Sequence, residues 1–186
     1  MPEWLGIPAA FVAWSFALYV YVVAPKTRGS LFLISMLFID GAAVISSYDN
    51  SQVISDWLSV DIEIVHRIHQ ASDWLLVGVY LPFIGLTLGS PLVRPLKGQR
   101  ARTVLLATGG LIALSVLILP EEARQVFNTP FYAVICIALA WGFIAALHSW
   151  IIATSEARRA RARAFTLAFG VRDVLWTFTF AMSFLY

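Results

Sequence analysis

The sequence predicts an all-α polytopic membrane protein, with about six transmembrane helices packed as a single domain over residues 1–186. Hydrophobic residues make up 60% of the chain and charged residues only 13%, about half the charged fraction of a typical soluble domain. Because so few charges could not cover a surface that faces water, we expect lipid to cover most of it. At this length there is room for one bundle and no separate soluble domain.

Six apolar segments each approach the roughly 20 residues that a helix needs to cross the hydrocarbon. They are predicted at about residues 4–23, 30–48, 65–88, 103–119, 128–154 and 165–186. Between the second and third, residues 51–64 place apolar side chains at helical spacing with three acids among them. This pattern predicts an interfacial helix on the outer face; an outward extension of the third span is the alternative.

The charges alternate from loop to loop, which predicts an orientation. Ten cations occupy the first, third and fifth loops: Lys26, Arg28, Arg94, Lys97, Arg100, Arg102, Arg158, Arg159, Arg161 and Arg163. The other two loops carry mostly acids: Asp49, Asp56, Asp61, Glu63, Glu121 and Glu122. By the positive-inside rule the basic loops are cytoplasmic, in a cell inner membrane, and the N-terminus is outside. Six spans also return the C-terminus to the outside, so we expect a seventh helix missing from this chain, a partner subunit or a second copy to pack there.

Ionisable residues inside the predicted spans mark the candidate functional site, since each costs about 2.5–3.5 kcal/mol on insertion scales. Asp40 lies eight residues before Tyr48, and Asp73 lies eight residues after Val65, the predicted outer ends of their spans. Both are therefore roughly 12 Å below the outer surface and can meet. His69 shares a helix face with Asp73. The predicted proton- or ion-binding cluster comprises Asp40, His69, Asp73, Arg172 and Asp173.

Three interpretations of this cluster compete. Arg172 can pair with Asp40 or Asp73 and serve packing alone. Two carboxylates in a low dielectric can instead share a proton, with His69 titrating nearby, which indicates a proton- or cation-handling site. Third, His66, His69 and Asp73 at i, i+3 and i+7 could bind a metal ion, although HxxH spacing is a weak signal and a fourth ligand is not evident.

A haem held between two histidines is disfavoured. His69 is predicted about 6 Å below the outer surface and His148 about 26 Å below it, and one iron cannot bridge that gap. His148 fits an inner-interface residue beside the aromatic anchor Trp150. No cofactor other than a metal ion is indicated.

The basic run Arg158, Arg159, Arg161 and Arg163 has two interpretations: a solvated cytoplasmic loop, or a contact for anionic lipid head groups at about 1 kcal/mol per cation. Nucleotide-binding and nucleic-acid motifs are absent from the sequence, so those partners are set aside.

A few short motifs resemble the microbial rhodopsins: Pro2-Glu3-Trp4 at the start of the first span, Asp73-Trp74 on the third, and Trp176 after a basic loop. In that family a lysine on a seventh helix attaches retinal. The only lysines here are Lys26 and Lys97, both in predicted cytoplasmic loops. A retinal Schiff base is therefore excluded in this chain, and the resemblance implies no activity.

The leading functional prediction is proton- or cation-linked membrane transport or sensing. In it Asp40 and Asp73 bind the proton or cation, His69 relays protons to the outer surface, Asp173 lines the pocket and Arg172 supplies the counter-charge. A membrane-embedded metal-dependent enzyme is the first alternative. An accessory subunit of a membrane complex, with no site of its own, is the second.

Overall fold

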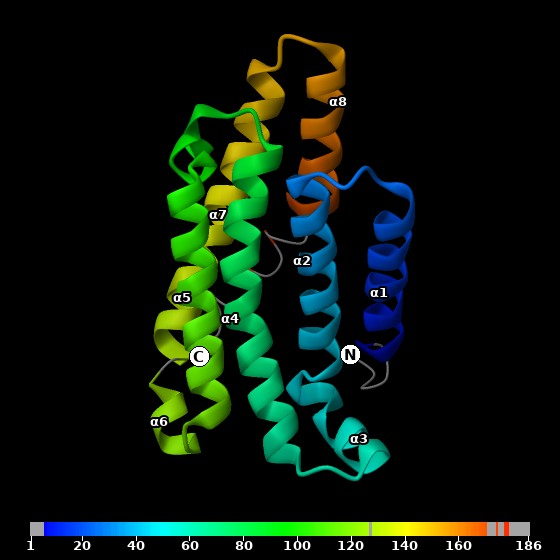
Figure 1. Ribbon diagram of the computed structural model, residues 1–186, viewed down its shortest axis with the longest axis vertical. Helices are drawn as coiled ribbons and strands as arrows, with labels where there is room; N and C mark the ends of the chain where they lie inside the picture. The colour runs from blue at the N-terminus through cyan, green and yellow to red at the C-terminus, as the bar shows by residue number, and fades with distance from the viewer. Residues whose placement is uncertain (1–5, 127, 171–173, 175–176, 179–186) are drawn as a thin grey trace. The chain divides into compact units, whose positions relative to one another are not determined.

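The computed structural model describes residues 6–126, 128–170, 174, 177 and 178, and over these residues all regular structure is helical (Figure 1). The elements in chain order are α1 (Gly6–Val23), α2 (Arg28–Ile45), α3 (Tyr48–Leu58), α4 (Ile62–Thr87), the 3₁₀ segment η2 (Pro91–Lys97), α5 (Gln99–Ile118), α6 (Glu121–Gln125), α7 (Asn128–Ile152), α8 (Glu156–Phe165) and the π-helical turn η3 (Thr166–Gly170). The predicted all-α fold class is confirmed.

Three of these helices are long and apolar enough to cross a membrane: α2, α5 and residues Pro130–Ile152 of α7. A fourth span results if α4 and η2, which meet at a bend of 120°, count as one. The apolar helix α1 is shorter. Most of the predicted sixth span lies outside the described residues. Where the sequence predicts a loop, residues Glu156–Phe165 form the basic helix α8.

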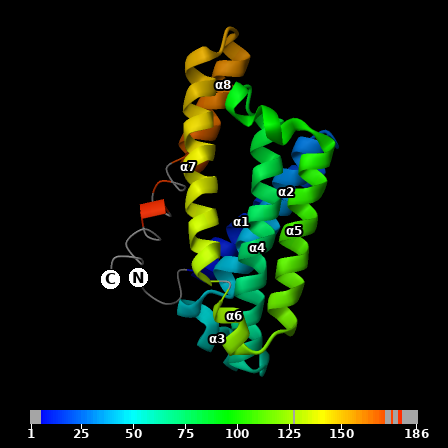
Figure 2. The same cartoon turned by 90° about the vertical axis from the view of Figure 1, so that its left-hand side faces the viewer.

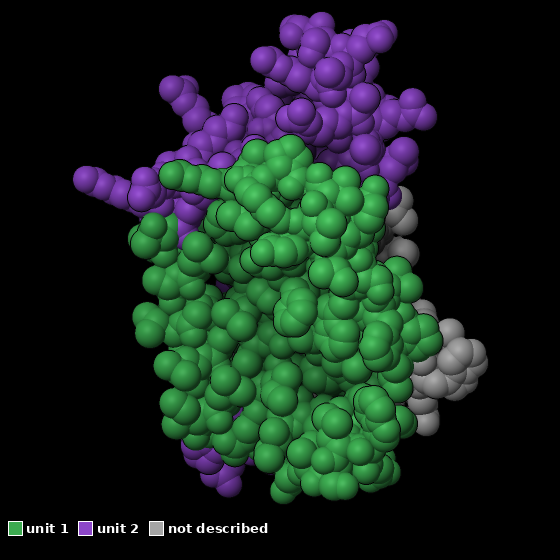
Figure 3. Space-filling view, turned by 45° about the vertical axis from the view of Figure 1, so that its right-hand side comes forward, with its two compact units in different colours: residues 1–83, 103–119 green, residues 84–102, 120–186 purple. Residues whose placement is uncertain are grey.

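The chain divides into two compact units, coloured separately in Figure 3. Unit 1 comprises Met1–Phe83 and Thr103–Leu119, and unit 2 comprises Ile84–Arg102 and Pro120–Tyr186. Within unit 1, α1 packs against α2, and α4 and α5 lie side by side in both ribbon views (Figures 1 and 2). Within unit 2, α7 packs against α8.

The contact of α1 with α2 is built around Trp14. Its indole Nε1 donates to the carbonyl oxygen of Phe38 at 3.0 Å. Gly41 makes room for the ring, since a Cβ at that position would lie 2.4 Å from the indole nitrogen. The turn before α2 is fixed by Thr27 and Ser30, which form a reciprocal capping box at the start of the helix. These contacts hold the α2 segment that carries Asp40.

The segment between α2 and α4 contains a sharp break at Ser59, a non-glycine residue with a left-handed φ of 54°. Ser59 ends α3 as its C-cap. Asp61 then starts α4, accepting a hydrogen bond from the backbone N–H of Glu63 at 2.8 Å. The acidic segment predicted as one helix over 51–64 is therefore split: α3 ends at Leu58, and α4 begins three residues before the predicted Val65.

Two contacts join α4 to α5 in unit 1. Gly78 and Gly109 let the two backbones approach closely. Nearer the acidic loops, Arg67 Nη1 donates to the carbonyl oxygen of Leu117 at 3.0 Å, while its Nε pairs with Glu63 at 3.2 Å. The last carbonyls of a helix have no partner within it, so the guanidinium caps the C-terminus of α5.

In unit 2, η2 folds back against the end of α4. A Cβ on Gly85 would lie 2.7 Å from the Cβ of Leu96, so only glycine permits this approach without a shift. Ser90 caps η2 through the backbone N–H of Leu92 at 3.1 Å.

Large apolar side chains point outward from α5 and α7, with Leu111, Ile118, Ile137 and Ile151 all at least 66% exposed. Such surfaces suit lipid contact.

Candidate functional site

The candidate site lies in unit 1, where α2 and α4 run antiparallel with a defined register. His69 on α4 contacts the backbone of Ala43 on α2. Four residues further along α4, Asp73 interacts electrostatically with Asp40, three residues back along α2. The structure therefore brings together Asp40, His69 and Asp73 of the predicted cluster, at one level of the two helices.

The hydrogen bond of His69 fixes which ring nitrogen can exchange a proton. His69 Nδ1 lies 2.9 Å from the carbonyl oxygen of Ala43. Because a carbonyl oxygen only accepts, Nδ1 must carry the hydrogen. In the neutral ring the lone pair is then on Nε2, and this atom lies 3.6 Å from Oδ2 of Asp73. The titratable nitrogen is thus aimed at the carboxyl group.

Both side chains are largely shielded, with 18% of His69 and 23% of Asp73 exposed. An ionised carboxylate in such surroundings is costly unless it is paired or accepts hydrogen bonds. Asp40 adds a second negative charge that acts on Asp73. A second negative charge near a shielded carboxyl group makes it unfavourable for both groups to ionise together.

A second polar contact lies one helical turn from His69, toward the start of α4. His66 Nε2 is 3.1 Å from the hydroxyl oxygen of Ser51, which is buried on α3. Because α2 has ended at Ile45, α3 supplies this contact. Polar groups thus continue from Asp73 through His69 toward His66 and the acidic segment.

The predicted metal ligands are not assembled as a metal-binding set. Within the part of the chain that the structure describes, no group of three or more His, Cys, Asp or Glu side chains is placed to hold a metal ion. His66 is hydrogen-bonded to Ser51, and the Nδ1 of His69 to the Ala43 carbonyl. Only His69 and Asp73 of the three lie together.

Arg172 and Asp173, the other two members of the predicted cluster, lie outside the described residues. Trp176 also lies outside them. The interpretation in which Arg172 neutralises Asp40 or Asp73 therefore stays a prediction.

A polar cluster that was not predicted from the sequence lies in unit 2. The hydroxyl of Ser90 is 3.0 Å from Nδ1 of His148, and the backbone N–H of Ser90 donates to the hydroxyl of Ser149 at 2.9 Å. Ser149 in turn donates to the carbonyl of Ala145 at 2.8 Å. These bonds tie the start of η2 to α7. The serine before Pro91 was a visible turn signal, but nothing in the sequence pairs it with a residue 58 positions later.

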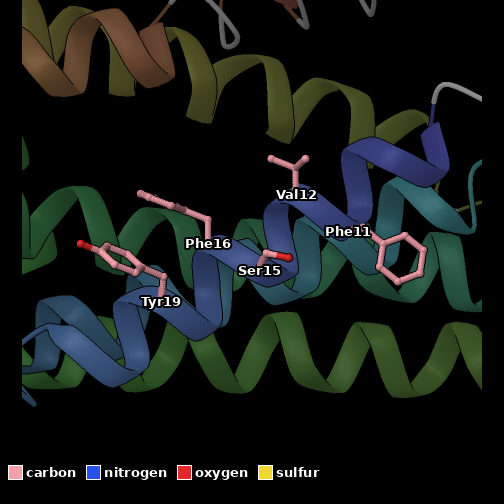
Figure 4. A pocket seen from close by; sticks show the side chains of 5 residues that line it. All are labelled: Phe11, Val12, Ser15, Phe16 and Tyr19. Atoms are coloured by element: carbon pink, nitrogen blue, oxygen red, sulfur yellow. The ribbon is translucent and has the colours of Figure 1, made fainter.

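One surface depression, of about 400 Å³, lies on α1 and is lined by Phe11, Val12, Ser15, Phe16 and Tyr19 (Figure 4). None of these five described residues carries a carboxylate, an imidazole or a cationic group. The depression offers apolar contact and no acid–base chemistry.

Comparisons with known proteins give no family for this chain: no family model, no curated protein and no solved structure matches it. The residues of the site are the basis for a functional proposal.

Proposed function

We propose that the cluster of Asp40, His69 and Asp73 binds a proton within the membrane and exchanges it with the outer face, for proton-linked transport or sensing. The observation that carries this proposal is the orientation of His69. Its Nδ1 is hydrogen-bonded to a backbone carbonyl, and its titratable Nε2 therefore faces Asp73. A histidine held only for packing would not require that nitrogen to face an acid.

The proposed proton path has two steps. Asp73, under the influence of Asp40, stores the proton. His69 Nε2 accepts it and then releases the same proton from Nε2 to water on the outer side, while Nδ1 keeps its hydrogen on the Ala43 carbonyl. His69 Nε2 and Asp73 Oδ2 are 3.6 Å apart, which is beyond hydrogen-bond distance. Proton transfer therefore requires the two atoms to approach each other or a water molecule to bridge them. His66 and Ser51 extend the polar route toward the acidic segment.

The proposal includes the membrane arrangement expected from the sequence: about six spans, the N-terminus outside and the basic loops cytoplasmic. Its support is the alternation of basic and acidic loops together with the apolar helices α2, α4, α5 and α7. In this orientation Asp73 exchanges protons with the outer medium, and the arginines of α8 lie at the cytoplasmic leaflet.

The experiment follows proton uptake in vesicles that contain the purified full chain and a trapped pH-sensitive dye. An imposed pH gradient should dissipate faster with the wild-type chain than with Asp73→Asn or Asp40→Asn if the protein transports protons. For a sensor without flux, infrared difference spectra should show a protonated carboxyl band that Asp73→Asn removes.

Asp56→Asn is the matched control, because Asp56 is an exposed acid on α3 that accepts a hydrogen bond from Gln52. It should behave as wild type in both assays. If Asp73→Asn and Asp40→Asn leave both the flux and the carboxyl band unchanged, the proposal is wrong. Flux that depends on Na⁺ or K⁺ but not on pH would show that the site carries a metal cation and not a proton.

A further inference from the structure

A hollow of about 430 Å³ in unit 2 lies where α7 ends and α8 begins. Leu147, Trp150 and Ile151 line it from α7, and Arg159 lines it from α8. The three α7 residues fall at i, i+3 and i+4, so they form one continuous apolar face. We infer that this hollow binds one anionic phospholipid, with the phosphate at Arg159 and an acyl chain along α7.

Arg159 is held in position for this contact. Its Nη2 donates to the carbonyl oxygen of Ala153 at 3.2 Å, in the turn between the two helices. The remaining N–H groups of a guanidinium form a planar fork that matches a phosphate. Ser155 starts α8 by accepting a hydrogen bond from the backbone N–H of Arg158, so α8 returns beside α7, as both ribbon views show (Figures 1 and 2).

The charge around the hollow selects an anion. Four exposed arginines lie within six residues of α8, with Glu156 as the one acid of that helix: Arg158, Arg159, Arg161 and Arg163. Each cation close to a membrane surface strengthens binding to anionic lipid. The site is therefore electropositive at its polar end.

The walls of the hollow select a lipid over a free phosphate. Ile151 is 71% exposed, and Leu147 is 39% exposed. A bound phosphate ion would leave these side chains uncovered, whereas an acyl chain would cover them. Trp150 also suits the boundary between head groups and hydrocarbon. An anionic phospholipid matches both ends of the site.

The test uses the full chain, stripped of lipid in a mild detergent, and counts bound lipid by native mass spectrometry. Dioleoyl phosphatidylglycerol is compared with dioleoyl phosphatidylcholine, which has the same chains and no net charge. We expect the first phosphatidylglycerol to bind about fivefold tighter or more. Arg159→Gln should abolish this preference, and Arg159→Lys should restore much of it.

Arg161→Gln is the matched control, because it removes the same charge from the same helix at a position that does not line the hollow. It should weaken binding by about twofold or less. Equal losses in Arg159→Gln and Arg161→Gln would show diffuse attraction to a basic helix and overturn the inference. Equal affinity for the two lipids would also overturn it.

A third arm separates the lipid from its phosphate. Ile151→Asn should weaken phosphatidylglycerol binding, and excess inorganic phosphate should not displace the lipid from the wild-type chain. Displacement by inorganic phosphate would show a free-anion site instead. Circular dichroism of each variant checks that the helices remain folded.

Discussion

Gly109 of α5 is in backbone contact with Gly78 of α4: a Cβ on Gly109 would lie 3.0 Å from the Cα of Gly78 and 2.9 Å from the carbonyl oxygen of Trp74. The carbonyl belongs to the residue that follows Asp73. The close approach of the two helices therefore fixes the part of α4 that carries the acid.

The neighbouring residue Gly110 gives a direct comparison, because a Cβ there would meet nothing within 4 Å. Gly109→Ala should destabilise the protein by about 1–3 kcal/mol, since the added methyl forces the helices apart. Gly110→Ala should be neutral or stabilise by up to about 1 kcal/mol, because alanine favours a helix. Thermal unfolding of the two variants in detergent measures the difference, and equal melting temperatures would contradict the close packing.

Substitutions of His69 should separate its structural role from its role in proton exchange. His69→Phe removes the donor to Ala43 and the partner of Asp73, so we expect both lower stability and slower proton exchange. His69→Asn retains an N–H donor for the carbonyl but has no titratable nitrogen. It should recover part of the stability while exchange stays at least about tenfold slower than in wild type. Recovery of exchange in His69→Asn would rule out the relay.

Arg67 should contribute more to stability through the carbonyl of Leu117 than through Glu63. A capping bond from a charged group typically stabilises by about 1.5–3 kcal/mol, whereas a partly exposed i,i+4 ion pair contributes about 0.3–0.5 kcal/mol. Chemical denaturation should therefore show a larger loss for Arg67→Met than for Glu63→Gln. Because Arg67→Met removes both contacts and Glu63→Gln removes only the ion pair, equal losses in the two variants would mean that the cap on α5 contributes nothing.

The hydroxyl of Ser149 should contribute more to the stability of the protein than the hydroxyl of Ser155, the exposed N-cap of α8. Ser149→Ala leaves the buried N–H of Ser90 without its acceptor, which costs about 1–3 kcal/mol. Ser155→Ala removes an exposed cap bond of 3.4 Å to the backbone of Arg158 and should cost about 1 kcal/mol or less. Melting temperatures of the two alanine variants provide the comparison. A smaller loss for Ser149→Ala would show that another group satisfies Ser90.

The main helices could be predicted from the sequence because each is a long apolar run with polar ends. The predicted segments 30–48, 65–88, 103–119 and 128–154 correspond to α2, α4, α5 and α7 with ends shifted by a few residues. The short element η2 could not be predicted, since it depends on contacts such as that of Gly85 with Leu96. The break at Ser59 was also hidden, because serine rarely adopts a left-handed conformation.

The meeting of Asp40 with Asp73 was predicted by counting residues from the expected helix ends, and those ends were not right. Asp40 lies five residues before the end of α2, and Asp73 lies eleven residues after the start of α4. Asp40 still acts electrostatically on Asp73, because α4 extends past the end of α2 and its first turns lie beside α3, where His66 contacts Ser51. The hydrogen bond of His69 to the carbonyl oxygen of Ala43 could not be predicted at all, since a backbone carbonyl has no sequence signature.

That carbonyl has a consequence for how the chain tolerates substitution. Whatever amino acid stands at position 43 presents the same oxygen, so no exchange of side chain there can directly delete the anchor of the imidazole. Only a residue too large for this buried position, or a loss of helical order in α2, would move it. The orientation of the titratable nitrogen is therefore set by the main chain. It can persist through substitutions that would remove a contact between two side chains.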